Sequence, residues 1–183
     1  MCDFNSLVDP CGVYNPAGTK TDMWLAAADH VTNVPKFKTE LVVPGTDPGD
    51  SVTIGEAYTM ASGKYFKKFK IIAQSGKVED NLVGEIGGKT FESMFTFQIA
   101  GTKADQLEFA KCIANGCVIA LPKEKSGQIR NLGSKDDYAW IESISLTTGQ
   151  KSGDLRGGTY VIKSVQGYPA PVYDSALAIP VAP

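Results

Sequence analysis

The chain has 183 residues, of which 43% are hydrophobic and 21% are charged, and its formal net charge is −2. This length suits one domain that buries roughly 70% of its unfolded surface, and the composition is ordinary for a soluble globular protein. The near-neutral charge argues against a dedicated nucleic-acid-binding protein, and no apolar run approaches the ~18 residues of a membrane-spanning helix.

Residues 1–19 are predicted to form an extended N-terminal arm, because they are rich in Asn, Pro and Gly. The opening sequence MCDFNSLVD has neither the basic region nor the apolar core of a signal peptide. Without an export signal we expect Cys2 and Cys11 to be free thiols, although a disulfide between them is conceivable. Cys112 and Cys117 are expected to be small buried hydrophobic residues.

Short strands are predicted over residues 20–27, 36–43, 51–60 and 64–74. The sequence PGTDPGD between the second and third contains no core residue. It predicts an exposed loop of Pro44, Gly45, Thr46, Asp47, Pro48, Gly49 and Asp50.

Lysines are interleaved with phenylalanines in the strand predicted over 64–74. Such a strand could bind single-stranded nucleic acid by stacking bases on its aromatic rings. We favour the simpler interpretation, in which the lysines face solvent and Phe66 or Phe69 enters the core, because lysine on an edge strand blocks unwanted pairing.

The stretch from Lys77 to Ala100 is predicted to be a long β-hairpin that turns at Gly87-Gly88, since paired glycines supply positive φ angles without a Cβ penalty. This turn pairs Glu85 with Thr90. One face is then apolar and comprises Val78, Leu82, Phe91, Phe95, Phe97 and Ile99. The other face is polar and acid-leaning, and comprises Lys77, Glu79, Asn81, Glu85, Glu92, Thr96 and Gln98, with Val83 and Met94 as apolar exceptions.

One amphipathic helix is predicted after the hairpin, with Thr102 as N-cap, the Asp105 carboxylate reaching back, and its end at Asn115-Gly116. Its apolar arc is expected to pack on the apolar hairpin face, and comprises Leu107, Phe109, Ala110, Ile113 and Ala114.

The rest of the chain predicts a strand over 117–121 stopped by Pro122, a hairpin around Ser126-Gly127, and strands over 137–148 and 159–167. In the strand over 137–148, one face is expected to carry Tyr138, Trp140, Ile144 and Leu146. Residues 168–183 contain four prolines and are predicted to form an extended C-terminal arm. The whole predicts a mainly β fold, a β-sandwich or incomplete barrel over residues 20–167 with one flanking α-helix and extended N- and C-terminal arms.

No stretch of the chain indicates an enzymatic reaction. The sequence from Gly84 to Thr90 approaches a phosphate-binding loop, but it has three residues between its glycines instead of four and precedes a strand. His30 is the single histidine, and the acidic pairs in the loops lack the distal Glu of a calcium loop. We therefore predict no catalytic residue, no metal site and no cofactor.

The order of these features resembles the major tail tube proteins of tailed bacteriophages, whose fold is shared by the tube protein of type VI secretion. Four segments spanning most of residues 10–173 carry the resemblance. They are the arm CGVYNPAGTKTDMWL, the loop PGTDPGD, the unit VEDNLVGEIGGKTFESMFTFQIAGT with its helix ADQLEFAKCIANG, and the closing pattern of IRNLGS, TTGQKSGDLRGG and TYVIKSVQGYPAPVY.

The resemblance implies homohexameric rings that stack into a tube, located in the virion tail after assembly in the host cytoplasm, with other tail proteins as partners and no membrane contact. It implies that hairpin strands line the inner wall, and that the arms and the loop from Gly45 to Asp50 contact the next ring. The polar hairpin face would then line the lumen. Residues 77–100 contain two lysines and four acids, a net −2 per subunit or about −12 per ring, which would let DNA slide without specific binding.

Two alternatives use the same features. A capsid decoration or head–tail joining protein would use the β-rich body and arms on a capsid lattice. A carbohydrate-binding module would use exposed aromatic residues such as Tyr14, Trp24 or Tyr168.

Overall fold

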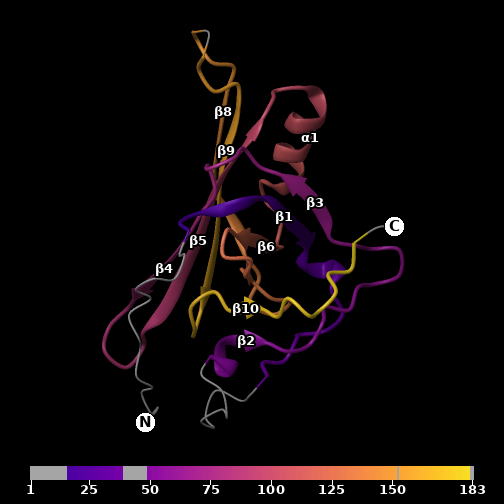
Figure 1. The fold of residues 1–183 in the computed structure, drawn as a ribbon, viewed down its shortest axis with the longest axis vertical. Helices are drawn as coiled ribbons and strands as arrows, with labels where there is room; N and C mark the ends of the chain where they lie inside the picture. The colour runs from indigo at the N-terminus through magenta and orange to yellow at the C-terminus, as the bar shows by residue number, and fades with distance from the viewer. Residues whose placement is uncertain (1–15, 39–48, 152, 182–183) are drawn as a thin grey trace.

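The computed structural model describes residues 16–38, 49–151 and 153–181, and in these residues the chain is mainly β with a single α-helix, as the sequence predicts (Figure 1). The elements in chain order are β1 (Thr19–Ala27), η1 (Ala28–His30), η2 (Asp50–Val52), β2 (Thr53–Ile54), β3 (Lys67–Lys70), β4 (Lys77–Val83), β5 (Thr90–Ala100), α1 (Ala104–Ile113), β6 (Val118–Glu124), β7 (Ile129–Arg130), β8 (Trp140–Thr147), β9 (Gly157–Gln166) and β10 (Val172–Tyr173).

The strands form two sheets that share one core. A six-stranded sheet has the order β2-β10-β7-β6-β1-β3, and a four-stranded sheet has the order β4-β5-β9-β8. The four-stranded sheet follows the long axis of the molecule in Figure 1, with α1 beside its upper half. The first core cluster joins both sheets to α1, and its larger members are Met23, Leu25, Phe95, Phe97, Ile113, Tyr160 and Ile162.

The six-stranded sheet is buried on its second face as well. Along β1, Met23 and Leu25 enter the first core cluster, whereas Trp24 and Ala26 belong to a second cluster with Tyr173. The C-terminal segment, expected to be an extended arm, lies along this face. β10 pairs with β2 and β7, and residues beyond it reach the bridge between Val181 and Phe66. The described part of the C-terminal segment is therefore packed on its own chain.

The hairpin is present, but its predicted turn is wrong. Val83 pairs with Thr90, so residues 84–89 form a six-residue loop and Glu85 lies in that loop instead of facing Thr90. The pairing differs from the predicted one by two residues. Because side chains alternate with a period of two, both predicted faces keep their membership along the strands.

The helix begins and ends one or two residues away from its predicted limits. Its N-cap is Lys103, whose backbone N–H donates to Gln106 Oε1 at 2.8 Å, while the Thr102 hydroxyl accepts a hydrogen bond from Arg156 at 2.9 Å. Ala110 and Ile113 are buried as predicted, but Leu107 and Ala114 are exposed.

Cys112 and Cys117 are exposed free thiols and not buried hydrophobic residues, although Ile113, next to Cys112, is buried in the core. Cys2 and Cys11 lie outside the described residues.

Four strand predictions are also corrected. The strands expected over 51–60 and 64–74 shrink to β2 and β3, and in the described part of 36–43 only an isolated bridge of Phe37 to Ile54 forms. β6 continues through Pro122 to Glu124, because Pro122 lies next to an irregularity in the pairing of β1 with β6.

The remaining correction concerns β8, whose register shifts between Ile141 and Ser143. This bulge places Trp140 and Ile144 on opposite faces of the strand, although a regular alternation predicts the same face.

Phe66 is buried and the four lysines of 64–70 are exposed, so the simpler interpretation of that stretch is confirmed.

Candidate functional surface

The four-stranded sheet has one face in the core and one polar face. All its side chains that join the first core cluster, such as Phe95, Phe97, Tyr160, Ile162 and Ile144, lie on one side, which we call the inner face. We call the opposite side the outer face, and from the strand pairing it comprises Lys77, Glu79, Asn81, Val83, Thr90, Glu92, Met94, Thr96, Gln98, Ala100, Trp140, Ser143, Ser145, Thr147, Thr159, Val161, Lys163 and Val165. Six of the seven predicted lumen-lining residues therefore share one surface, and Glu85 lies in the adjoining loop.

Ion pairs and hydrogen bonds connect the strands across the outer face. Lys163 Nζ on β9 lies 2.8 Å from Glu92 Oε1 on β5, and Gln98 Nε2 donates to Thr159 Oγ1 at 3.3 Å. The hydrogen bond to Glu92 raises the pKa of the Lys163 ammonium above its ordinary value. Lys163 therefore stays charged at neutral pH, and its ion pair with Glu92 holds two long side chains against the sheet.

The second ion pair of the outer face lies on the edge strand β4. Lys77 Nζ is 2.6 Å from Glu79 Oε1, and both side chains are well exposed at 65% and 43%. Such a pair contributes about 0–1 kcal/mol to folding because water screens it. The pair compensates the positive charge of Lys77 with a nearby carboxylate, as Glu92 does for Lys163, so each lysine of the outer face has a carboxylate beside it.

The net charge of residues 77–100, which is −2, is more negative than the net charge of the outer face. Asp80 contributes to the predicted −2, yet it points to the inner side, where its partner is Arg130. Lys163 of β9, which follows Glu92 by 71 residues in the chain, adds a positive charge. Glu142 lies at the bulge of β8 and accepts a hydrogen bond at 3.1 Å from the indole of Trp140 on the outer face, so it adds a negative charge to this face. The outer face carries Lys77 and Lys163 against Glu79, Glu92 and Glu142, a net charge of −1 in the described residues.

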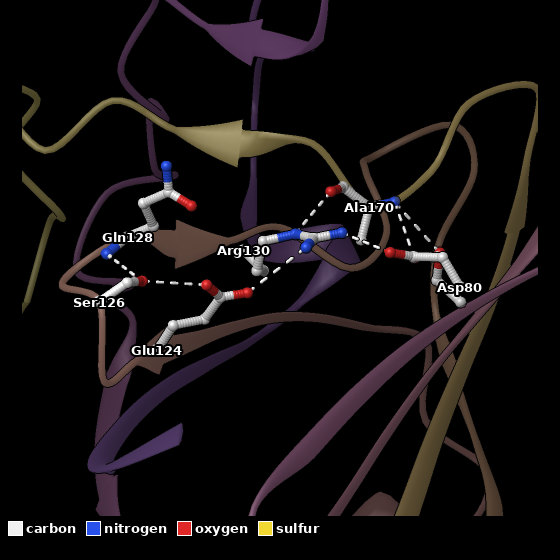
Figure 2. Close-up of polar contacts among 7 residues, drawn as sticks. Asp80, Glu124, Ser126, Gln128, Arg130 and Ala170 are labelled. Atoms are coloured by element: carbon white, nitrogen blue, oxygen red, sulfur yellow. Dashed lines mark hydrogen bonds and ion pairs between the residues drawn. The ribbon is translucent and has the colours of Figure 1, made fainter. Parts of the chain in front are cut away.

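A largely buried polar network fixes the hairpin to the six-stranded sheet (Figure 2). Asp80 accepts hydrogen bonds from the Arg130 guanidinium, the Ser93 hydroxyl and the Ala170 backbone N–H. Arg130 also donates to the Ala170 carbonyl at 2.7 Å and to Glu124 at 3.4 Å. The side chains of Arg130 and Asp80 are each only about a fifth exposed. Their contact therefore orients β4 so that Asp80 points to the inner face and Glu79 to the outer face.

Both edge strands of the four-stranded sheet lack a second neighbour among the described strands. β4 pairs with β5 alone and β8 pairs with β9 alone. An unprotected edge carries a row of backbone N–H and C=O groups that can pair with another chain. β8 is eight residues long and its last residues, Ser145 to Thr147, are exposed.

The predicted inter-ring residues lie mostly outside the described part of the chain, which contains Gly49 and Asp50 of that set. Gly49 is exposed with a φ of 96°, and its carbonyl accepts a hydrogen bond from the Thr53 hydroxyl at 2.8 Å. These two residues begin the short helix η2, so the described end of the loop is anchored to β2.

An apolar cavity of about 460 Å³ lies between the end of β1, β3 and the end of α1, and its lining includes Leu25, His30, Phe69, Phe109 and Cys112. His30 lies 3.9 Å from its neighbour Asp29, and the lining offers no second imidazole.

Among the described residues, His, Cys, Asp and Glu do not gather into a group of three suited to a metal ion. Nor does the described part contain a helix that could cross a bilayer.

The aromatic residues suggested for sugar binding are engaged within the chain where they are described. Trp24 packs against the second core cluster and has Lys68 Nζ 5.7 Å from its ring centre. Tyr168 meets Phe37 edge-on, with ring centres 5.0 Å apart. Tyr14 lies outside the described residues.

Comparison of the chain with models of known protein families, with curated proteins and with solved structures gave no match.

Proposed function

We propose that this protein is a structural virion protein whose copies join edge to edge into rings, and that the rings stack into a phage tail tube through which DNA passes. The observation that carries the proposal is the four-stranded sheet. One of its faces is core, its other face is polar, and both of its edges are open. The resemblance of the sequence to tail tube proteins supports the same assembly.

The edges supply the contact that closes a ring. Pairing of β4 in one copy with β8 in the next extends the sheet, and a sheet that closes on itself has no edges left. Six copies of four strands make twenty-four strands, which at about 4.8 Å apart give a circumference of roughly 115 Å. Barrels of about 16–18 strands already enclose an aqueous channel, so this larger barrel would enclose a wide one.

The chemistry of the outer face suits a channel that DNA must traverse. DNA binds proteins through cations that neutralise its phosphates. Lys77 and Lys163 each lie beside a carboxylate, at 2.6 Å and 2.8 Å, so neither presents an uncompensated charge. The net charge of this face is −1 per copy, less negative than the −2 of residues 77–100, so it repels DNA less than the hairpin alone would. DNA would pass chiefly because the face offers no uncompensated cation to bind its phosphates.

The proposal is tested by following assembly of the purified protein with concentration. Sedimentation velocity and negative-stain electron microscopy should show rings, and tubes at higher concentration, with a central stain-filled channel. Monomers that persist at high concentration without rings or tubes would contradict it. Binding of the unassembled protein to phage heads instead of tails would favour a capsid decoration or joining role.

A further inference from the structure

The apolar cavity of about 460 Å³ is bordered by the end of β1, by β3 and the residues just before it, and by the end of α1 (Figure 1). Leu25 lines it, together with Phe69 and Phe109, whose ring centres are 4.7 Å apart. These three side chains lie in or against the first core cluster, so the cavity is on the inner side of the four-stranded sheet. Its volume is within the range of about 300–1,000 Å³ that is usual for small-molecule sites.

Two lysines border this apolar lining. Lys64 and Lys67 both line the cavity, and both are exposed. The pairing of β3 with β1 places Lys67 opposite Leu25, on the same face of β3 as Phe69. The methylene stems of the two lysines can therefore cover apolar surface while their ammonium groups stay in water at the edge of the cavity.

These two charges have no acidic partner in the described part of the chain. None of the residues that line the cavity is Asp or Glu. The acids on β1, η1 and α1 all lie outside the lining, and they are Asp22, Asp29, Asp105 and Glu108. Lys68, on the opposite face of β3, pairs with Asp22 at 2.8 Å, whereas no described carboxylate lies within ion-pair distance of Lys64 or Lys67.

We propose that this cavity binds a small organic anion with an aliphatic body and a carboxylate head. The body lies against Leu25, Phe69 and Phe109, and removal of its apolar surface from water drives binding. The carboxylate lies at Lys64 and Lys67, whose charges orient the ligand and select against a neutral or cationic head. The cavity is on the opposite side of the four-stranded sheet from the outer face, so this site does not depend on the proposed tube.

The first test is calorimetric titration with three ten-carbon probes, below their micelle concentrations and below the protein concentration of assembly. Decanoate carries a negative head, decanol a neutral head and decyltrimethylammonium a positive head. Decanoate should bind at least about threefold more tightly than decanol, and the cation should bind most weakly. Equal affinity for the three probes, or no binding of decanoate, would overturn the proposal.

Two lysines of the same strand provide a matched pair of variants. Lys67→Glu places a negative charge at the cavity, whereas Lys70→Glu makes the same change on the opposite face of β3, outside the lining. Both side chains are exposed, so circular dichroism should be unchanged in both variants. Lys67→Glu should weaken decanoate binding at least about threefold, and Lys70→Glu by less than about twofold. An equal effect of the two substitutions would contradict the assignment of the head group.

The thiols of Cys112 and Cys117 report where the ligand lies, because both are exposed and both line the cavity. At a decanoate concentration about ten times its Kd, their reaction with a maleimide should slow about tenfold. Peptide mapping by mass spectrometry measures the rate at each cysteine. An unchanged rate at saturating decanoate would show that the anion binds elsewhere, and the proposal would be wrong.

Discussion

Asp80 and Glu79 are adjacent acids on β4 that point to opposite faces, and replacing each with alanine tests the orientation of the hairpin. Asp80→Ala removes the acceptor of three hydrogen bonds, from Arg130, Ser93 and Ala170. Glu79→Ala removes one exposed ion pair with Lys77. The two changes delete the same kind of charge one position apart, so each serves as the other's control.

The expected losses differ several-fold. Removing one partner of a buried ion pair costs about 3–5 kcal/mol, but Arg130 keeps Glu124 and the Ala170 carbonyl, and the Ala170 N–H keeps the Ser93 hydroxyl at 3.2 Å. We therefore expect Asp80→Ala to lower the free energy of unfolding by about 3 kcal/mol, or roughly 6–12 °C in Tm for a chain of this size. Glu79→Ala should cost about 0–1 kcal/mol.

The free energy of unfolding is measured by urea titration at a protein concentration below that of assembly, followed by tryptophan fluorescence, with Tm from circular dichroism. Arg130→Met in the Asp80→Ala background should cost less than Arg130→Met alone, since the arginine has already lost its main partner. A loss for Glu79→Ala as large as that for Asp80→Ala would refute the assignment of inner and outer faces.

Three further predictions follow from local geometry. Gly157→Ala should destabilise the fold by several kcal/mol, because its Cβ would lie 2.2 Å from a backbone oxygen of β5, whereas Gly88→Ala, with open space around it, should be nearly neutral in the same urea titration. Cys112 and Cys117 should react with a maleimide in the native protein, as peptide mapping by mass spectrometry would show; protection of both before unfolding would contradict their exposure. Two backbone N–H groups hold the pKa of Asp154 below its ordinary value, so its contribution to stability is present above pH ~4 and lost as the pH falls through the lowered pKa. The difference in unfolding free energy between wild type and Asp154→Asn should therefore shrink below pH ~4, and a difference that is constant from pH 7 to 3 would refute this.

The sequence predicts the two faces of the hairpin because hydrophobic alternation records which side chains are buried. The prediction survives a wrong turn, since a shift of two residues returns every side chain to the same face. The inward acid Asp80 was visible in principle, because it lies between Val78 and Leu82 on the apolar side. Its partner Arg130 is 50 residues away, and a single sequence does not reveal that pairing.

Other features depend on tertiary contacts that leave no local pattern. The bulge in β8 moves Trp140 to the outer face without any glycine or proline to mark it. β2 and β10 are two residues long, and they are strands because β10 pairs with both β2 and β7. The net charge of the outer face includes Lys163 and Glu142, which come from strands far from the hairpin in the sequence. They join this face only because β9 pairs with both β5 and β8.

The most direct test of the central claim is cryo-electron microscopy of the assembled protein. The four-stranded sheets should close into one continuous barrel, with the outer face of Glu79, Glu92 and Lys163 lining a central channel. An assembly in which these three side chains face outward, or are buried against a neighbouring copy, would contradict it.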